Sequence, residues 1–344
     1  MQDSRSPLTP ALKVILQEAR LPGRPNQEPK PDSSTPALVE FNALFRKATT
    51  ADRLEAMQHI AEALADCQPL GAARLVLFCG SYFQAGLVDA SFTTPAVADL
   101  FRRQLTLITP IIQSVPENEE PPYDLSALAE GQQREAIQSY AILCQGFAYY
   151  LAVSPELRSS LKQDQPFMAQ LETAEGLLPE TSWICETLET SSGEIVVLAP
   201  GEQKGFLVAY RNLSKCFHFF TLLQEALASH FRLDLAPHAS AIAMARGDKA
   251  INHDETDCAI WTYCDYHGLD DKFSLVWGEM APAYIPKFEG KQIVLLLPLA
   301  FYRSWNATFF GPRLGPRSSV EIIQVLPRQE VIERCERLQQ QSKQ

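Results

Sequence analysis

The sequence lacks a long apolar run, and it lacks an excess of basic charge. No apolar stretch reaches the length of about 18 residues that a membrane-spanning helix requires. The net charge is −11 and the pI is near 5.1. Nucleic acids and anionic membranes attract basic surfaces. We therefore expect that the protein binds neither nucleic acid nor membrane.

The sequence also predicts neither a secretory leader nor a disulfide framework. Residues 1–20 carry Asp3, Arg5, Lys13 and Glu18 in place of the uninterrupted apolar core of a signal peptide. The eight cysteines are too sparse for a small disulfide scaffold and lie mostly in apolar, helix-like sequence: Cys67, Cys79, Cys144, Cys185, Cys216, Cys258, Cys264 and Cys335. Both features predict a soluble cytoplasmic protein with free thiols.

None of the common nucleotide-binding or nucleophile motifs is present. The sequence contains no G-x-S-x-G elbow, no Walker loop and no G-x-G-x-x-G, and residues 201–205 read as a hairpin turn. A repeat of fixed period is also missing, so the sequence does not support a TPR or ankyrin array. These absences favour a binding function over an enzymatic one.

What the sequence does contain is a helical half followed by a strand-bearing half. At 344 residues the chain exceeds the usual size of one hydrophobic core. Residues 37–190 space their apolar side chains as helices do, and Thr94-Pro95 and Ser154-Pro155 match helix starts with a cap and a proline. The six or seven predicted helices indicate an irregular all-helical domain, either a bundle or a HEAT-like stack.

Residues 1–36 precede this domain. Leu12, Ile15, Leu16 and Ala19 would share one face of a short amphipathic helix, and a proline-rich linker follows at residues 21–36. Such a helix can pack on its own domain, or it can be a tethered peptide that docks into a partner. We favour the first alternative, because amphipathic helices usually cover their own core.

The sequence pattern changes near residue 190 from helical spacing to strand-like runs. Residues 191–344 are therefore expected to form an α+β domain with a mixed sheet and a C-terminal helix. Residues 192–198 and 205–211 predict a hairpin. Residues 293–297 are apolar without alternation, which indicates a strand covered on both faces. Further strands are predicted at residues 273–277 and 320–326, and residues 281–290 are expected to be a rigid connector because they contain Pro282 and Pro286.

The densest group of metal-capable and nucleophilic side chains lies between residues 253 and 267. His253, Cys258, Cys264 and His267 are candidate zinc ligands, although their spacing matches no known zinc motif. Alternatively, Cys264 could be a nucleophile activated by His267, with Asp265 as the group that orients the histidine. The simpler interpretation is a solvated loop, with its cysteines buried as structural residues. No cofactor is predicted, and zinc is the one metal considered.

A second candidate site lies between residues 300 and 330. Arg303, Arg313 and Arg317 give this segment a positive charge in an acidic protein, and Trp305 lies between them in the sequence. Guanidinium groups held outward by neighbouring prolines suit the capture of a carboxylate or phosphate. The simpler alternative is that these arginines pair with the acidic residues near 117–120 or 270–271, and that the tryptophan belongs to the core.

Together these features predict a non-enzymatic interaction or regulatory protein, of the adaptor or immunity-like type. The arginine and tryptophan group of the second domain would bind a protein partner or a small anionic ligand. The alternative is a hydrolase that uses the Cys/His/Asp or metal site near residues 253–267.

Overall fold

The chain forms two compact units, Met1–Leu188 and Glu189–Gln344. The computed structural model describes residues 8–22, 35–89, 91–115, 124–231, 237–252, 254–269, 274–310 and 316–341. The described part of the first unit is helical, and that of the second combines a mixed sheet with helices. The predicted α+β class is therefore confirmed.

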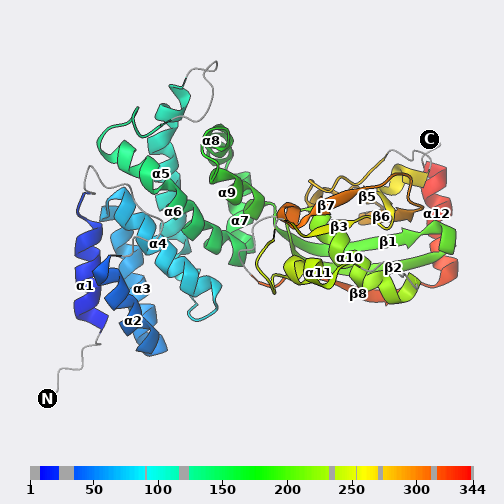
Figure 1. Ribbon diagram of the computed structural model, residues 1–344, viewed down its shortest axis with the longest axis horizontal. Helices are drawn as coiled ribbons and strands as arrows, with labels where there is room; N and C mark the ends of the chain where they lie inside the picture. The colour runs from blue at the N-terminus through cyan, green and yellow to red at the C-terminus, as the bar shows by residue number, and fades with distance from the viewer. Residues whose placement is uncertain are drawn as a thin grey trace. The chain divides into compact units, whose positions relative to one another are not determined.

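The first unit is an irregular set of helices between 8 and 23 residues long. Thr35, Thr49, Ser154 and Asp164 cap four of them by accepting a hydrogen bond from a backbone N–H of the first turn. The helices are α1 (Leu8–Ala19), α2 (Pro36–Lys47), α3 (Thr50–Ala63), α4 (Pro69–Gln84), α5 (Thr94–Gln113), α6 (Gly131–Val153), α7 (Pro155–Gln163), α8 (Gln165–Glu175) and α9 (Thr181–Leu188) (Figure 1). None of the described helices combines the length and apolar character that crossing a membrane requires.

Helices α4 and α6 meet at two glycines in the centre of this unit. A Cβ added at Gly80 would lie 2.7 Å from the carbonyl oxygen of Gly146, and a Cβ added at Gly146 would lie 2.7 Å from the backbone N of Leu77. Both distances are too short for real Cβ contacts, so the helix backbones touch here without side chains between them. This close approach packs the buried faces of α4 and α6 against each other.

Helix α1 packs within its own unit. Its apolar face is buried, and the backbone N–H of Gln68, just before α4, donates to the carbonyl oxygen of Ala19 at 2.9 Å. At Gly71 a Cβ would lie 2.3 Å from the same oxygen, so only glycine allows the two helices to approach this closely. Of the two alternatives for this helix, the structure therefore shows the packed one.

The second unit is built on a mixed six-stranded sheet. Its strand order is β4-β6-β1-β2-β8, with β5 paired to β6, and a separate ribbon pairs β3 with β7. The strands are β1 (Ser191–Ala199), β2 (Lys204–Leu213), β3 (Thr256–Cys258), β4 (Thr262–Cys264), β5 (Lys287–Phe288), β6 (Lys291–Leu297), β7 (Ser304–Asn306) and β8 (Ser319–Val325). Strand β1 is parallel to β6 and antiparallel to β2.

Strand β6 lies inside the sheet between β4 and β1, as its continuous apolar sequence predicts. One face of the sheet is covered by α10 (Cys216–Phe231) and α11 (Ala239–Arg246), and the other by α12 (Arg328–Gln341) (Figure 1). Side chains of β1 alternate between these two cores: Ile195 and Val197 face α10, whereas Val196 and Leu198 face α12. A strand inside this sheet is therefore covered on both faces, which is why the sequence of β6 is apolar without alternation.

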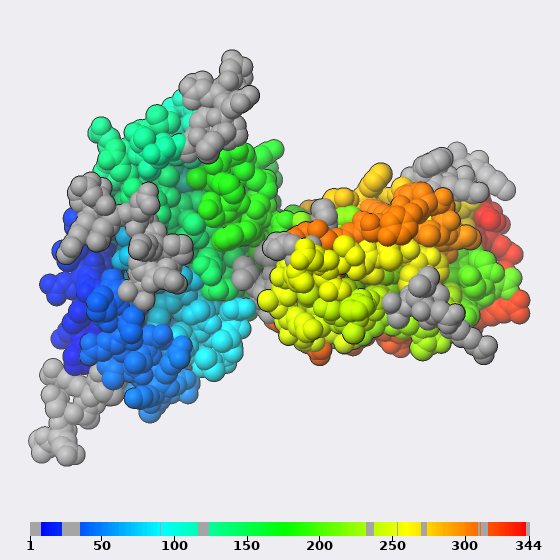
Figure 2. Space-filling model, in the orientation of Figure 1, coloured from blue at the N-terminus to red at the C-terminus, as the bar shows by residue number. Residues whose placement is uncertain are grey.

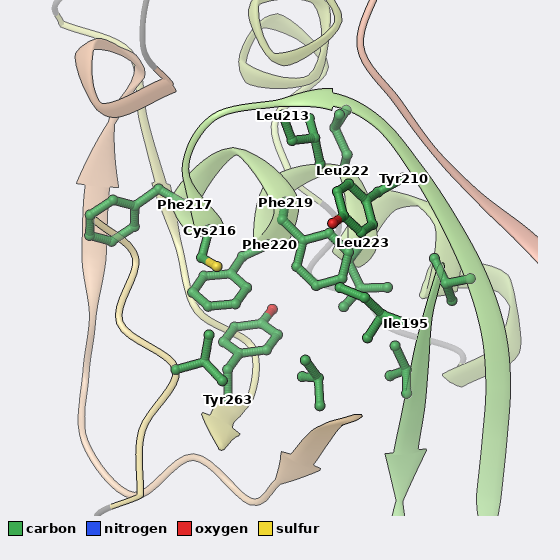
Figure 3. Close-up of a cluster of buried hydrophobic side chains, with 14 of the residues drawn as sticks. Ile195, Tyr210, Leu213, Cys216, Phe217, Phe219, Phe220, Leu222, Leu223 and Tyr263 are labelled. Atoms are coloured by element: carbon green, nitrogen blue, oxygen red, sulfur yellow. The ribbon is translucent and has the colours of Figure 1, made fainter. Parts of the chain in front are cut away.

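The core beneath α10 is strongly aromatic. The ring of Phe220 stacks on that of Tyr263 (Figure 3). The ring centroids are 3.9 Å apart and the interplanar angle is 6°. Phe217 and Trp305 also meet, at 5.3 Å between centroids. Because Tyr263 belongs to β4 and Trp305 to β7, these rings connect the helix to both sheets.

Two predictions for the second unit differ from the structure. The predicted strand at residues 273–277 is reduced to one bridge, between Leu275 and Cys264, and Phe273 lies outside the described residues. The predicted connector at residues 281–290 ends in β5, which turns into β6 through Glu289 and Gly290, both with positive φ. Strand β5 could not be predicted from the sequence, because sequence signals for a strand need a run of about four to eight residues and β5 has two, directly after Pro286.

Candidate functional site

The segment that joins β6 to β7 forms an exposed apolar surface of the second unit. Residues 298–302, Pro-Leu-Ala-Phe-Tyr, are all exposed and carry no charge. Leu299 is 46% exposed, Phe301 45% and Tyr302 76%. Three large apolar side chains in five residues form a contiguous exposed stretch, which in folded proteins commonly marks an interaction surface.

The backbone of this segment is fixed even though its side chains are exposed. Thr262 on β4 donates from Oγ1 to the carbonyl oxygen of Pro298 (3.2 Å) and accepts from the backbone N–H of Ala300 (2.8 Å). At the far end, the backbone N–H of Ala259 donates to the carbonyl oxygen of Arg303 (2.8 Å). The segment is thus held at three points, so its apolar side chains are presented by an ordered backbone.

Arg303 follows this segment and lies in an aromatic setting. Its guanidinium carbon is 5.1 Å from the ring centroid of Phe217, 6.0 Å from that of Phe220 and 5.6 Å from that of Trp277. Stacking of this kind is favourable because aromatic faces are electron-rich. Burial lowers the pKa of Arg303, and the neighbouring carboxylate of Glu279 acts in the opposite direction.

Trp277 extends the apolar surface next to Arg303. Its side chain is 59% exposed, and the preceding backbone N–H, of Val276, donates to the carbonyl oxygen of Tyr263 at 2.9 Å. In Figure 2 the orange residues around position 300 form a band on the visible surface of the second unit. We call Trp277, Leu299, Phe301 and Tyr302, together with Arg303, the aromatic patch.

Trp305, two residues further on, is buried and belongs to the core, as the simpler alternative for this residue predicts. Its Nε1 donates to Thr221 Oγ1 (3.0 Å), and that hydroxyl donates to Asp257 Oδ2 (2.6 Å). Asp257 and Trp305 are paired residues of β3 and β7. The ribbon that ends the exposed segment is therefore tied to α10 through buried hydrogen bonds.

Gln224 on α10 completes this network. Its Nε2 donates to Asp257 Oδ2 (3.3 Å), and its Oε1 accepts from the backbone N–H of Ile260 (2.9 Å) and from the hydroxyl of Tyr263 (2.9 Å). Burial raises the pKa of Asp257, and the hydrogen bonds from Thr221 and from the backbone of Cys258 lower it in part. Every polar group of this set has a partner, so the network can position the surface above it.

Of the other predicted arginines, one pairs with an acidic residue of the same unit and one lies outside the described residues. Arg317 is exposed and pairs with Asp248, with 2.6 Å between Nη2 and Oδ2. Arg313 lies outside the described residues, as do residues 117–120 and 270–271, the acidic groups predicted to pair with the arginines. Of the arginine and tryptophan group, the structure therefore places Arg303 alone, among its described members, in the aromatic patch.

The structure places the described members of the predicted Cys/His group on different elements. Cys264 is buried on β4, where a Cβ added at Gly268 would lie 2.3 Å from its own Cβ. Cys258 is exposed on β3. His267 is exposed, and its backbone N–H donates to Asp265 Oδ1 at 2.9 Å.

Because His253 lies outside the described residues, the predicted zinc set is only partly described. Within the described ranges, no three or more His, Cys, Asp or Glu side chains are grouped so that they could hold a metal ion. A nucleophilic thiolate must also reach its substrate, whereas the side chain of Cys264 is fully buried. The catalytic and metal hypotheses for this region stay predictions.

Alkylation of the native protein with iodoacetamide is expected to modify Cys258 well before the buried cysteines. The thiol of Cys258 is exposed, whereas burial raises the pKa of Cys79 to about 12 and also raises that of Cys216. Peptide mapping by mass spectrometry over a time course measures the order. The urea-unfolded chain, in which all eight react, is the control, and early modification of Cys264 would instead favour the nucleophile hypothesis.

Comparison of the chain with family models, with curated proteins and with solved structures finds no match in any of the three. Any functional site must therefore be inferred from the structure of this chain alone.

Sequence reasoning missed most of the aromatic patch. It singled out Arg303 but not Trp277, Leu299, Phe301 or Tyr302. One signal was available: an apolar run that continues past Pro298, beyond the end of a buried strand, without a charged residue. That signal is weak, because the same residues could equally have turned inward.

Proposed function

We propose that this protein is a protein-binding adaptor or immunity-like regulator, and that the aromatic patch is its partner-binding surface. The observation that carries the proposal is the exposed apolar segment at residues 298–302, whose backbone is held by Thr262 and Ala259. An ordered backbone loses little conformational entropy on binding, so more of the contact energy appears as affinity.

The residue types of the aromatic patch support the same proposal. Tryptophan, tyrosine and arginine are the residues that contribute most often and most strongly to protein interfaces, and the patch contains one of each: Trp277, Tyr302 and Arg303. The exposure of Trp277 and Tyr302 favours a protein over a small anionic ligand, since small ligands are held in clefts that bury most of their surface. We further propose that the protein is soluble and acts in the cytoplasm, a reducing compartment that suits its eight cysteines, none of which forms a disulfide.

The test is a binding measurement on the full chain. The tagged protein is isolated with its bound partner, and the purified partner is titrated by calorimetry. The double variant Phe301→Ser with Tyr302→Ser is expected to weaken binding by at least about 30-fold, which is the effect of losing a strong interface contact. The fold is expected to be unchanged, because both side chains are exposed.

The matched control lies on β8. Ile323 and Val325 are about as exposed as Phe301, and the double variant Ile323→Ser with Val325→Ser removes a comparable apolar surface elsewhere on the same unit. Binding by this variant is expected to equal that of the unmodified chain. An equal loss in both double variants, or no loss in the first, would count against the aromatic patch as the binding surface.

A further inference from the structure

Arg303 makes few hydrogen bonds within the protein, although most of its side chain is covered. Its side chain is 15% exposed. Among the described residues its one hydrogen bond runs from Nη1 to the carbonyl oxygen of Val276, at 3.3 Å. A guanidinium has five N–H donors, so most of the donors of Arg303 have no protein acceptor in the described structure. None of its nitrogens is among the buried side-chain atoms without a partner, so these donors are open to solvent and to a bound molecule.

The ion pair of Arg303 is also loose. Nη2 of Arg303 lies 3.8 Å from Oε2 of Glu279, and the side chain of Glu279 is exposed. Charge-assisted hydrogen bonds between guanidinium and carboxylate are normally about 2.7–2.9 Å long. The same unit contains tight pairs of this kind, Arg246 with Glu225 at 2.5 Å and Arg317 with Asp248 at 2.6 Å. Glu279 therefore lies close to Arg303 without satisfying it.

The position of the guanidinium is nevertheless fixed. The rings of Phe217, Phe220 and Trp277 surround it, and the carbonyl oxygen of Val276 orients one of its nitrogens. A guanidinium held in this way loses little freedom when it binds a planar acceptor. The uncharged segment at residues 298–302 lies directly before it in the chain. A charged anchor thus adjoins an apolar surface.

We propose that Arg303 recognises a carboxylate of the partner, and that the partner segment is an acidic peptide in which Asp or Glu adjoins large apolar residues. This inference rests on the proposed function of the aromatic patch. The partner carboxylate forms the short hydrogen bonds that Glu279 does not form, and Glu279 is displaced into solvent. Glu279 is then an internal competitor, which keeps the charge of Arg303 balanced while the partner is absent.

The test begins with a phage-displayed library of random dodecapeptides, selected on the full chain. Selected peptides are expected to contain Asp or Glu next to apolar residues. In fluorescence anisotropy with the synthetic peptides, replacing that acid by its amide is expected to weaken binding about 10- to 100-fold, as is Arg303→Lys, because charged hydrogen bonds are lost. Arg303→Lys keeps the positive charge and removes only the planar fork. Arg317→Lys is the matched control and is expected to change nothing.

Glu279→Gln gives the outcome that a purely structural role of Arg303 would not produce. Removing an exposed competitor that is worth at most about 1 kcal/mol is expected to tighten binding by about two- to five-fold. Glu321→Gln, the same change at an exposed position of β8, is the control and should leave the affinity unaltered. Weaker binding by Glu279→Gln would overturn the inference.

The library also separates this inference from the proposed function. If peptides bind the unmodified chain and lose affinity with Phe301→Ser and Tyr302→Ser, but show no preference for acids, the aromatic patch is a binding surface and the role of Arg303 is wrong. If no peptide distinguishes the unmodified chain from that double variant, both proposals fail.

Discussion

Gly146→Ala is expected to destabilise the protein by about 3 kcal/mol, although the same change in an exposed helix stabilises by about 1 kcal/mol. The new Cβ would lie 2.7 Å from the backbone N of Leu77, 2.8 Å from its Cα and 2.9 Å from the carbonyl carbon of Val76. These are helix backbone atoms, which cannot rotate away as a flexible side chain would. Helices α4 and α6 must therefore separate, and the buried surfaces on both sides of the crossing lose contact.

Urea unfolding followed by the helical circular dichroism band measures this loss as a lower midpoint at an unchanged slope. Gly176→Ala is the matched control, because no atom lies within 4 Å of a Cβ placed there and its φ is −67°. That variant is expected to be neutral or slightly stabilising. If both glycine variants behaved alike, the close crossing of α4 and α6 would be in error.

Gln224→Ala is expected to cost about 4 kcal/mol, the sum of a small cavity and of several buried polar groups left without a partner. The backbone N–H of Ile260 and the hydroxyl of Tyr263 lose their acceptor, and Asp257 loses one donor. The exposed Gln324→Ala on β8 is the control and is expected to lie within about 0.5 kcal/mol of the unmodified chain.

The cost of Gln224→Ala is expected to depend on pH. Burial raises the pKa of Asp257 in the folded state, so the stability associated with this carboxyl is full below its unfolded pKa and is lost as the pH rises through the folded one. Removing the amide that donates to the carboxylate raises the folded pKa further. Urea titrations should therefore show a larger loss at about pH 7 than at about pH 4, and a constant loss would mean that Gln224 does not stabilise the charged form.

The fold was predictable where several residues gave the same signal. Ser154 and the proline after it both indicated the start of α7. In the structure, the backbone N–H of Leu157 donates a hydrogen bond to the side-chain oxygen of Ser154. The apolar run at residues 293–297 predicted a strand that is covered on both faces, and β6 does lie inside the sheet. Such signals are local, because caps and periodicity act within one or two turns of the chain.

The short ribbon of β3 and β7 gave no comparable signal. Each strand has three residues, and they are paired across almost 50 residues of chain, with Asp257 opposite Trp305. An acidic residue is an unusual choice for a buried strand, and it is acceptable here only because Thr221 and Gln224 of α10 supply hydrogen bonds. No pattern within residues 256–258 indicates these partners.

The candidate site shows the same division. The sequence could propose Arg303 and Trp305 together, because both residue types are common at interfaces. Both side chains contact the ring of Phe217, but the indole of Trp305 is buried and donates to Thr221, whereas the guanidinium of Arg303 also lies beside the exposed ring of Trp277. The sequence gives no sign of this difference in burial, because it depends on which residues of α10 and of residues 276–280 lie alongside.

The sequence by itself determined that this protein has a helical half and a strand-bearing half, because the spacing of apolar residues along each segment selects helix or strand locally. Only the tertiary structure decided which apolar side chains are covered. Leu295 and Phe301 are both large and apolar, and they lie six residues apart, yet the first is buried between two layers and the second is exposed. Burial depends on what the rest of the chain brings alongside, and that is a property of the whole fold.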